Sequence, residues 1–203
     1  MGTREEILAA ATRVMREQGY ARATTKEIAR VAGYSEATLY KHFADKAHLF
    51  RSVLSEQLPG LGKVLTELTE RAGTGTVQAN LTQVARLALD FYTESFPIAA
   101  SLFSTRELLT SHRRAMADHG AGPRNPHEGL VRYLKAEQRL GRLPRSADPE
   151  ALSALLLGAC FQQAFLTAFD DAEPSGKERE KLAKSLVKTL LQGLAPTARP
   201  ATA

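Results

Sequence analysis

The sequence predicts an all-α fold of about nine or ten helices, and three observations carry this prediction. Apolar residues recur three or four positions apart in most segments of the 203-residue chain, which is the period of an amphipathic helix. Residues that cap or break helices stand between those segments. No stretch alternates between apolar and polar residues over the length of a strand.

The N-terminal segment is expected to hold one longer helix followed by short ones. Apolar residues within 4–18 fall on one helical face, with Thr3 as the expected N-cap and Gly19 as the expected end. Residues 26–32 and 36–43 read as two short helices, the second capped by Ser35. A fourth helix starts at Lys46, after Asp45 as its cap.

The rest of the chain is expected to hold longer helices separated by breaks. Pro59 and Gly60 interrupt the fourth helix, because a proline removes a backbone hydrogen bond. Pro97 is expected to open a new helix, as is Pro149 after its cap Asp148. The predicted spans are residues 77–95, 97–117, 127–140, 149–169 and 177–194.

Composition limits the possible classes of protein. The chain has 27 basic and 22 acidic residues, a formal net charge of +5, which permits an acidic partner such as nucleic acid. No window approaches ~18 uninterrupted apolar residues, and the charged start lacks the apolar core of a signal peptide. The single cysteine, Cys160, allows no intramolecular disulfide and no multi-thiolate metal site. We therefore expect a cytoplasmic protein.

Residues 26–43 carry the strongest functional signal. Two short helices joined by Gly33, Tyr34 and Ser35 have the layout of a helix-turn-helix, whose second helix lies in the major groove of DNA. Side chains of the second helix can contact base edges, and those around it can hydrogen-bond phosphates. The expected DNA contacts are Thr25, Ser35, Glu36, Ala37, Thr38, Tyr40, Lys41, His42 and Lys46.

Spacing alone leaves a second interpretation open, namely an ordinary helical hairpin with a solvated polar face. In either case Leu39 and Phe43, four residues apart, are expected to face a small core with Ile28 and Ala29. His42 on its own is more typical of a surface or capping histidine, and Tyr40 of a half-buried packing residue.

The order of residues around this segment resembles the DNA-binding signature of the TetR family of bacterial repressors. The resemblance is specific over about residues 4–50 and looser afterwards. Tyr34 stands where the family usually has an aliphatic residue, and we expect it to pack beside the turn. The matching elements are Ile28-Ala29, Ala32-Gly33-Tyr34-Ser35, Leu39-Tyr40-x-His42-Phe43, Lys46-x-x-Leu49 and, further on, Leu140-Gly141-Arg142-Leu143 before Asp148-Pro149.

The resemblance implies a division of the chain and a function. Residues 1–50 become a DNA-binding domain, residues 51–196 a helical ligand-binding and dimerisation domain, and residues 197–203 a disordered tail. A family member of this kind is a ligand-responsive repressor that binds a palindromic operator as a homodimer. A small, largely hydrophobic effector releases it from double-stranded DNA. Activation in place of repression stays open.

The same resemblance implies an effector pocket and a dimer interface in the second domain. Every aromatic candidate for the pocket also fits plain core packing. The pocket candidates are Phe91, Tyr92, Phe96, Leu102, Phe103, Arg106, His112, Tyr133, Phe161, Gln162 and Phe165. The dimerisation candidates are Leu152, Leu156, Leu182, Leu186 and Leu190, on the last two helices.

Two other classes of function fit the sequence less well. An enzyme is disfavoured because no histidine stands at metal-ligand spacing. His112 and His119 are seven residues apart and would share one face of a continuous helix, but a glycine-rich loop begins directly after His119. We therefore expect no catalytic residue, no metal and no cofactor. The second alternative is a helical dimer that binds an apolar ligand and whose head no longer binds DNA, and the intact segment 25–49 argues against it.

Overall fold

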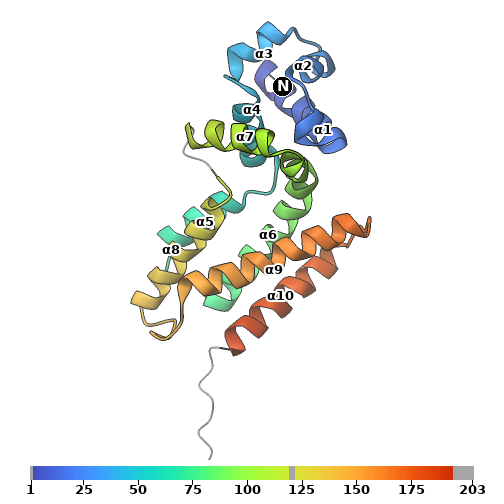
Figure 1. Cartoon of the computed structure of the whole chain (residues 1–203). Helices are drawn as coiled ribbons and strands as arrows, with labels where there is room; N and C mark the ends of the chain where they lie inside the picture. Colours follow the sequence, from blue (N-terminus) through green and yellow to red (C-terminus); the bar gives the residue numbers. More distant parts are fainter. Residues whose placement is uncertain (1, 119–121, 194–203) are drawn as a thin grey trace, which may run out of the picture.

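The computed structural model describes residues 2–118 and 122–193, so the expected tail at 197–203 lies outside the described residues. Within this part of the chain, ten α-helices and no strand are present. Figure 1 shows α1 to α4 gathered at one end as a head, and α5, α6 and α8 to α10 forming the body. The prediction of an all-α fold with an N-terminal head is confirmed.

The helices of the head follow the expected order, and the first helix differs from the prediction in two respects. Its helices are α1 (Thr3–Arg22), α2 (Thr25–Ala32), α3 (Glu36–His42) and α4 (Lys46–Ser52), which continues as a π-helical turn, η1 (Val53–Gln57). The expected cap Thr3 is wrong, since Thr3 is the first residue of α1 and Gly2 precedes it as the cap. Gly19 is a kink and not the end, because helix geometry resumes after it.

One helix of the body runs through the point at which the sequence predicted a break between two helices. Pro97 does not open a helix; it lies inside α6, exposed near the C-terminal end, where the loss of one backbone hydrogen bond is tolerated. The break at Pro59 and Gly60 is confirmed. The body helices are α5 (Leu61–Glu70), α6 (Val77–Ala100), α8 (Asn125–Arg139), α9 (Pro149–Phe169) and α10 (Gly176–Gln192). A 3₁₀ turn, η2 (Ser101–Phe103), and α7 (Arg106–Asp118) lie between α6 and α8.

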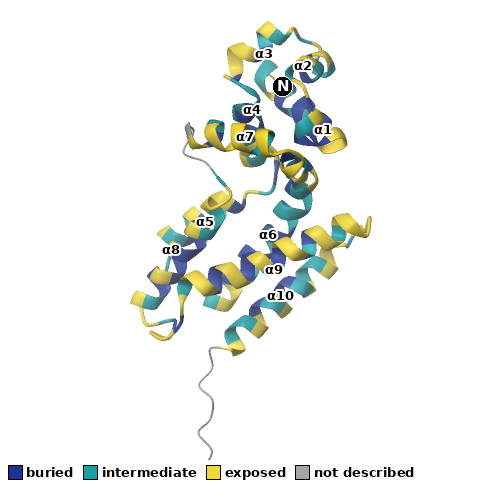
Figure 2. Cartoon of the chain, in the orientation of Figure 1, coloured by how far each residue is buried: buried dark blue, intermediate teal, exposed yellow. Residues whose placement is uncertain are grey.

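Two hydrophobic cores hold the molecule together. The core of the body forms where α5, α6 and α8 to α10 bury their apolar faces, and Figure 2 shows these buried stretches. The core of the head is built from α1 to α4, and it also takes in Ile98, Leu102 and Met116. Because these three come from α6, η2 and α7, head and body share one packed joint.

Helix α9 also has the length and apolar composition of a membrane-spanning helix. A core helix of a water-soluble protein passes the same test, so this is weak evidence for a membrane span. Here α9 packs against α6, α8 and α10 and contributes Leu152, Leu156 and Cys160 to the core of the body.

Candidate nucleic-acid interface

The turn between α2 and α3 is built as a helix-turn-helix requires. Gly33 adopts a left-handed conformation (φ 81°) and ends α2, a geometry that glycine reaches without steric cost. The Ser35 hydroxyl caps α3 by accepting a hydrogen bond from the Thr38 amide at 3.1 Å. Thr24 caps α2 in the same way through the amide of Glu27. Local capping therefore fixes where both helices begin.

Buried side chains hold α3 against the rest of the head. Leu39 and Phe43 are fully buried with Ile28 and Ala29, as the sequence predicted. Tyr34 packs beside this core and its hydroxyl donates a hydrogen bond to the Glu6 carboxylate on α1. The polar face of α3 is thereby turned outward, since the apolar face is used for anchoring.

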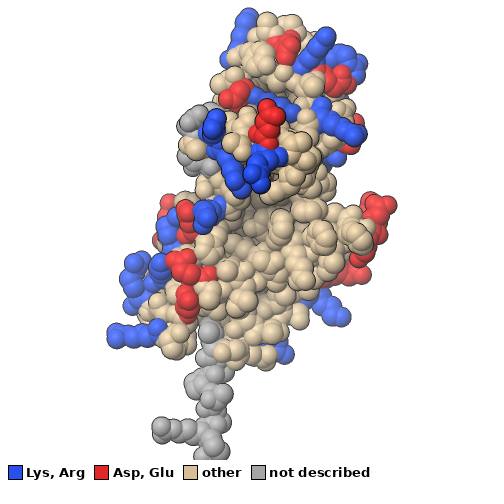
Figure 3. Space-filling model, in the orientation of Figure 1, with Lys and Arg blue, Asp and Glu red and all other residues tan. Residues whose placement is uncertain are grey.

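The outward face carries most of the predicted DNA contacts. Ser35, Ala37, Tyr40, Lys41 and His42 are exposed, and Thr25, Glu36 and Thr38 are half-buried. The Thr25 hydroxyl donates to Glu36 Oε1 at 2.5 Å and lies 3.2 Å from the Tyr40 hydroxyl. Three predicted contacts from two helices thus meet at one point of the surface. On the face visible in Figure 3 the head carries several basic side chains, with acidic ones among them.

Lys46 lies apart from this face. Its ammonium group sits 4.3 Å from the centre of the Tyr20 ring and donates to the Ala21 carbonyl at 3.4 Å. Burial lowers the pKa of Lys46 from its ordinary value. The predicted phosphate contact therefore requires this flexible side chain to leave the joint between head and body.

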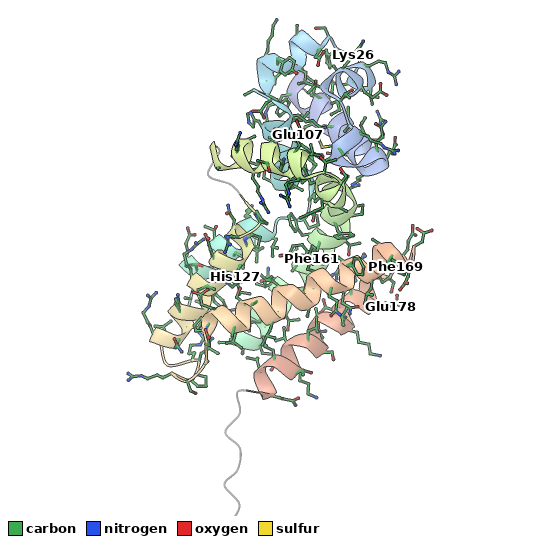
Figure 4. The ribbon with its side chains drawn as sticks, viewed as in Figure 1. Lys26, Glu107, His127, Phe161, Phe169 and Glu178 are labelled. Atoms are coloured by element: carbon green, nitrogen blue, oxygen red, sulfur yellow. The ribbon has the colours of Figure 1, made fainter. Side chains whose placement is uncertain are left out.

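The predicted effector residues fall into separate places. Five of them form a connected aromatic cluster, with edge-to-face ring contacts whose centroids are 5.5 to 5.8 Å apart. The members of this aromatic cluster are Phe91, Tyr92, Phe96, Phe161 and Phe165. Phe169 stacks on Phe165 and was missed by the sequence analysis, although it continues the four-residue spacing of Phe161 and Phe165. Figure 4 labels Phe161 and Phe169 along α9.

The other effector candidates do not join this cluster. Leu102 is buried in the head core, and Phe103 is 71% exposed. His112 packs against Tyr20 and Phe50, with ring centroids 4.9 and 5.2 Å away. Arg106 and Gln162 are exposed.

Tyr133 also lies away from the aromatic cluster. It is fully buried in the core of the body, where its hydroxyl accepts a hydrogen bond from Asn80 at 2.9 Å. An open groove of about 980 Å³ runs between α6 and α10, and its lining includes Arg86, Lys184 and Lys188. None of the effector candidates lines this groove.

The dimerisation candidates also divide. Leu152 and Leu156 are buried in the core of their own chain, so they offer no free surface to a partner. Leu182, Leu186 and Leu190 are half-buried and pack against that core. The exposed apolar surface of α9 lies away from the side that carries Leu152 and Leu156. The sequence did not predict this surface. The surface comprises Leu155, Phe161, Phe165, Leu166 and Phe169, together with Ala151, Ala154 and Gly158 between them.

The remaining polar side chains form no metal-binding group within the residues described. No group of three or more metal-ligating side chains occurs in this part of the chain, and His119 lies outside it. Cys160 is buried, its thiol faces the Ala85 carbonyl at 3.6 Å, and burial raises its pKa to about 12. The thiol is therefore protonated at neutral pH.

Residues 7–53 match the family model described as bacterial regulatory proteins, tetR family. The chain is 38% identical over 148 residues to the uncharacterized HTH-type transcriptional regulator YvkB of Bacillus subtilis, covering 73% of this chain and 74% of that protein. It is 34% identical over 185 residues to the HTH-type transcriptional repressor AcnR of Corynebacterium diphtheriae, covering 90% and 87% of the two chains.

Solved structures show the same fold. A regulator from Mesorhizobium loti, described as a putative TetR-family member, matches with a TM-score of 0.70 at 23% identity, covering 94% of this chain and 96% of that one. NalD of Pseudomonas aeruginosa, the secondary repressor of a multidrug efflux pump, matches with a TM-score of 0.62 at 24% identity, covering 97% and 98%.

Proposed function

The chain belongs to the TetR family of bacterial transcriptional regulators, and from this premise we propose that it is a repressor that binds a palindromic operator as a homodimer. A small, largely hydrophobic effector releases it from DNA. The observation that carries the proposal is the intact helix-turn-helix, whose polar face is free while its apolar face is buried. Such a regulator acts on the chromosome, so we place it in the bacterial cytoplasm.

We assign base recognition to the N-terminal part of α3. Ala37 and Thr38 can contact thymine methyl groups, and Glu36 can accept a hydrogen bond from cytosine. Lys41 can donate to guanine or to phosphate. Thr25, Tyr40, His42 and Lys46 are assigned to phosphates, which fix the register of the head on the duplex. Ser35 stays with the start of α3, where its hydroxyl caps the helix.

We assign the dimer interface to the part of the exposed apolar surface of α9 that lies outside the aromatic cluster, namely Leu155, Leu166 and Phe169 with the small residues between them, joined by the leucines along α10. Leu155 is 63% exposed and Phe169 77% exposed, and an isolated chain in water rarely leaves so large a continuous apolar face open. The broad uncharged surface over α9 in Figure 3 fits this role. A two-fold dimer sets two copies of α3 about 34 Å apart, one turn of DNA, so that they read two half-sites together.

The aromatic cluster between α6 and α9 is the place we assign to the effector. Its rings offer an apolar contact surface, and effector sites are mostly apolar with a few polar groups. The effector acts by binding one head arrangement more tightly than the other. A coupling of about 1–3 kcal/mol, or 5–150-fold in DNA affinity, is the general scale of such effects.

The bend between η1 and α5 is the place where we expect movement to reach the head. A π-helical turn ends at Gln57, and Pro59 and Gly60 separate it from α5. A π-helical turn is uncommon and is frequently found at a functional site. If Pro59→Ala leaves the response to effector unchanged, this bend does not transmit the signal.

The test of DNA binding uses the full-length protein and two sources of duplex. The first is the DNA that flanks its own gene, and the second is a random duplex pool from which bound sequences are selected. We expect a palindromic consensus and a mobility shift that Tyr40→Phe weakens and Lys177→Ala, on the exposed surface of α10, leaves unchanged. A folded dimer that gives no shift at low salt and selects no consensus overturns the proposal.

The effector is sought separately. A thermal-shift screen of hydrophobic metabolites and drugs identifies binders, and each binder is then tested for release of the bound duplex. We expect at least one binder to release DNA. A folded dimer that binds apolar compounds but no DNA would instead support the alternative of a ligand-binding module. A reporter gene placed behind the selected operator separates repression from activation.

A further inference from the structure

The last turn of α1 is bent where it meets the body. Gly19 has φ 73° and ψ 164°, a backbone conformation that only glycine adopts readily. Helix geometry resumes after it and ends at Arg22. The bend leaves the amide of Ala21 free to bond outside α1, because the backbone at Gly19 departs from the helix.

Ser101 fills this bend from the end of α6. Its hydroxyl oxygen accepts a hydrogen bond from the Ala21 amide at 2.9 Å and donates to the Ile98 carbonyl at 3.2 Å. A Cβ atom built on Gly19 would lie 2.9 Å from that oxygen. The serine side chain therefore occupies the space that the missing Gly19 side chain leaves, and one hydroxyl links α1 of the head to α6 of the body.

Two further contacts fix the same pair of helices. Arg16, one turn before the bend, forms an ion pair with Glu94 of α6. Ile98 of α6 is fully buried in the core of the head. Residues 94 and 98 of α6 and residue 101 directly after it thus hold α1, which sets the angle of the head on the body.

We propose that Ser101 is a positioning residue for operator recognition, in that its hydrogen bond to Ala21 fixes the separation of the two heads and therefore the half-site spacing that the dimer accepts. The proposal rests on the proposed function above. Ser101 contacts no DNA, since it acts through α1. One base pair of extra spacer moves a half-site by about 3.4 Å and rotates it by about 35°, so a rigid head tolerates little change.

The experiment measures spacing selectivity. The palindrome selected from the random pool is rebuilt with its spacer shortened or lengthened by one and two base pairs, and affinities are measured for the wild type and Ser101→Ala. We expect the wild type to prefer one spacing clearly. In Ser101→Ala, loss of one hydrogen bond should reduce this preference by about fivefold, mainly through better binding to the shifted sites.

Ser104→Ala is the matched control, because Ser104 is exposed three residues further on. Arg16→Gln is a second variant that removes the ion pair to Glu94 from an exposed position and should flatten the spacing profile in the same direction. Exchange of the Ala21 amide with solvent deuterium reports directly on the hydrogen bond. It should be faster in Ser101→Ala and unchanged in Ser104→Ala.

The outcomes separate the two proposals. If the wild-type dimer selects no palindrome, the proposed function fails. If the wild type shows a sharp spacing optimum and folded Ser101→Ala and Arg16→Gln both keep it, the function stands and the role of Ser101 is overturned. A uniform loss of affinity of Ser101→Ala at all spacings, with the spacing preference intact, also contradicts the role of Ser101, because that result indicates general destabilisation.

Discussion

The Tyr34 hydroxyl donates a hydrogen bond to the Glu6 carboxylate and so ties the turn before α3 to helix α1. Tyr34 occupies the position at which the sequence departs from the usual aliphatic residue, and it packs on the head core while its hydroxyl reaches α1. Tyr34 is therefore a second anchor for α3, in addition to the buried Leu39 and Phe43.

Tyr34→Phe keeps the ring and removes this anchor. We expect the free energy of unfolding to fall by about 1 kcal/mol, a typical value for one hydrogen bond. Urea denaturation of the wild type, Tyr34→Phe, Glu6→Gln and the double variant measures the pairwise coupling. If the losses in unfolding free energy of the two single variants simply add in the double variant, the hydrogen bond between Tyr34 and Glu6 contributes nothing to stability.

Lys46→Ala tests whether this lysine reaches DNA. The ammonium group rests on the Tyr20 ring in the structure, and a phosphate offers it a stronger, charge-assisted partner. We expect the slope of log affinity against log salt to fall by about 0.9, the value for one phosphate contact. Lys63→Ala, an exposed lysine of the body, should leave the slope unchanged. An unchanged slope in Lys46→Ala means that the lysine stays in the joint.

His112 should make the stability of the chain depend on pH. Burial, and secondly the nearby Lys46, lower the pKa of His112 below its ordinary value. As pH falls through about 6.5, the unfolded chain takes up a proton that the folded chain does not, so the free energy of unfolding decreases on acidification. The loss fades above about pH 7.5, where the imidazole is largely neutral in both states.

The measurement compares urea denaturation at pH 7.5 and pH 5.5. We expect His112→Phe, which keeps an aromatic ring against Tyr20 and Phe50, to lose less stability between these pH values than the wild type. His42→Gln is the control, since His42 is exposed on α3. Equal losses in the wild type and His112→Phe would contradict the assignment.

The sequence predicted most of the fold because the signals were local. Thr24, Ser35 and Asp45 cap the expected helices, and Leu39 and Phe43 are buried as their spacing indicated. Pro97 misled the prediction because an exposed position near a helix end tolerates a proline that an internal buried position would not.

Contacts between distant segments were beyond the reach of periodicity. Leu152 and Leu156 share the apolar character of α9 with Leu155, but only packing decides which of them faces α6 and which stays free. The same holds for Lys46 and His112, whose surroundings are set by the approach of α7 to the head. Periodicity predicts a helix end and not a kink at Gly19, because the partner Ser101 lies 82 positions further along the sequence.

Glu137 should be the most sensitive charged residue of the body. It is fully buried, its Oε1 accepts a hydrogen bond from the Gly73 amide at 3.2 Å, and its Oε2 lies 3.2 Å from Arg142 Nε. We expect Glu137→Ala to lower the free energy of unfolding by about 3–5 kcal/mol, because Arg142 is left without its counter-charge in a partly buried site. Denaturation in urea measures this, with the exposed Glu128→Ala on the same helix as control.

Cys160 should be inert in the folded protein. Its pKa of about 12, raised from 9 by burial, leaves about a thousandfold less thiolate at neutral pH than an ordinary thiol has, and only the thiolate attacks a disulfide reagent. We expect an aromatic disulfide reagent to label Cys160 at a rate at least about a thousandfold below that of the urea-unfolded chain. Fast labelling of the folded protein would mean that α9 opens away from α6 without global unfolding, since the thiol faces Ala85 of that helix.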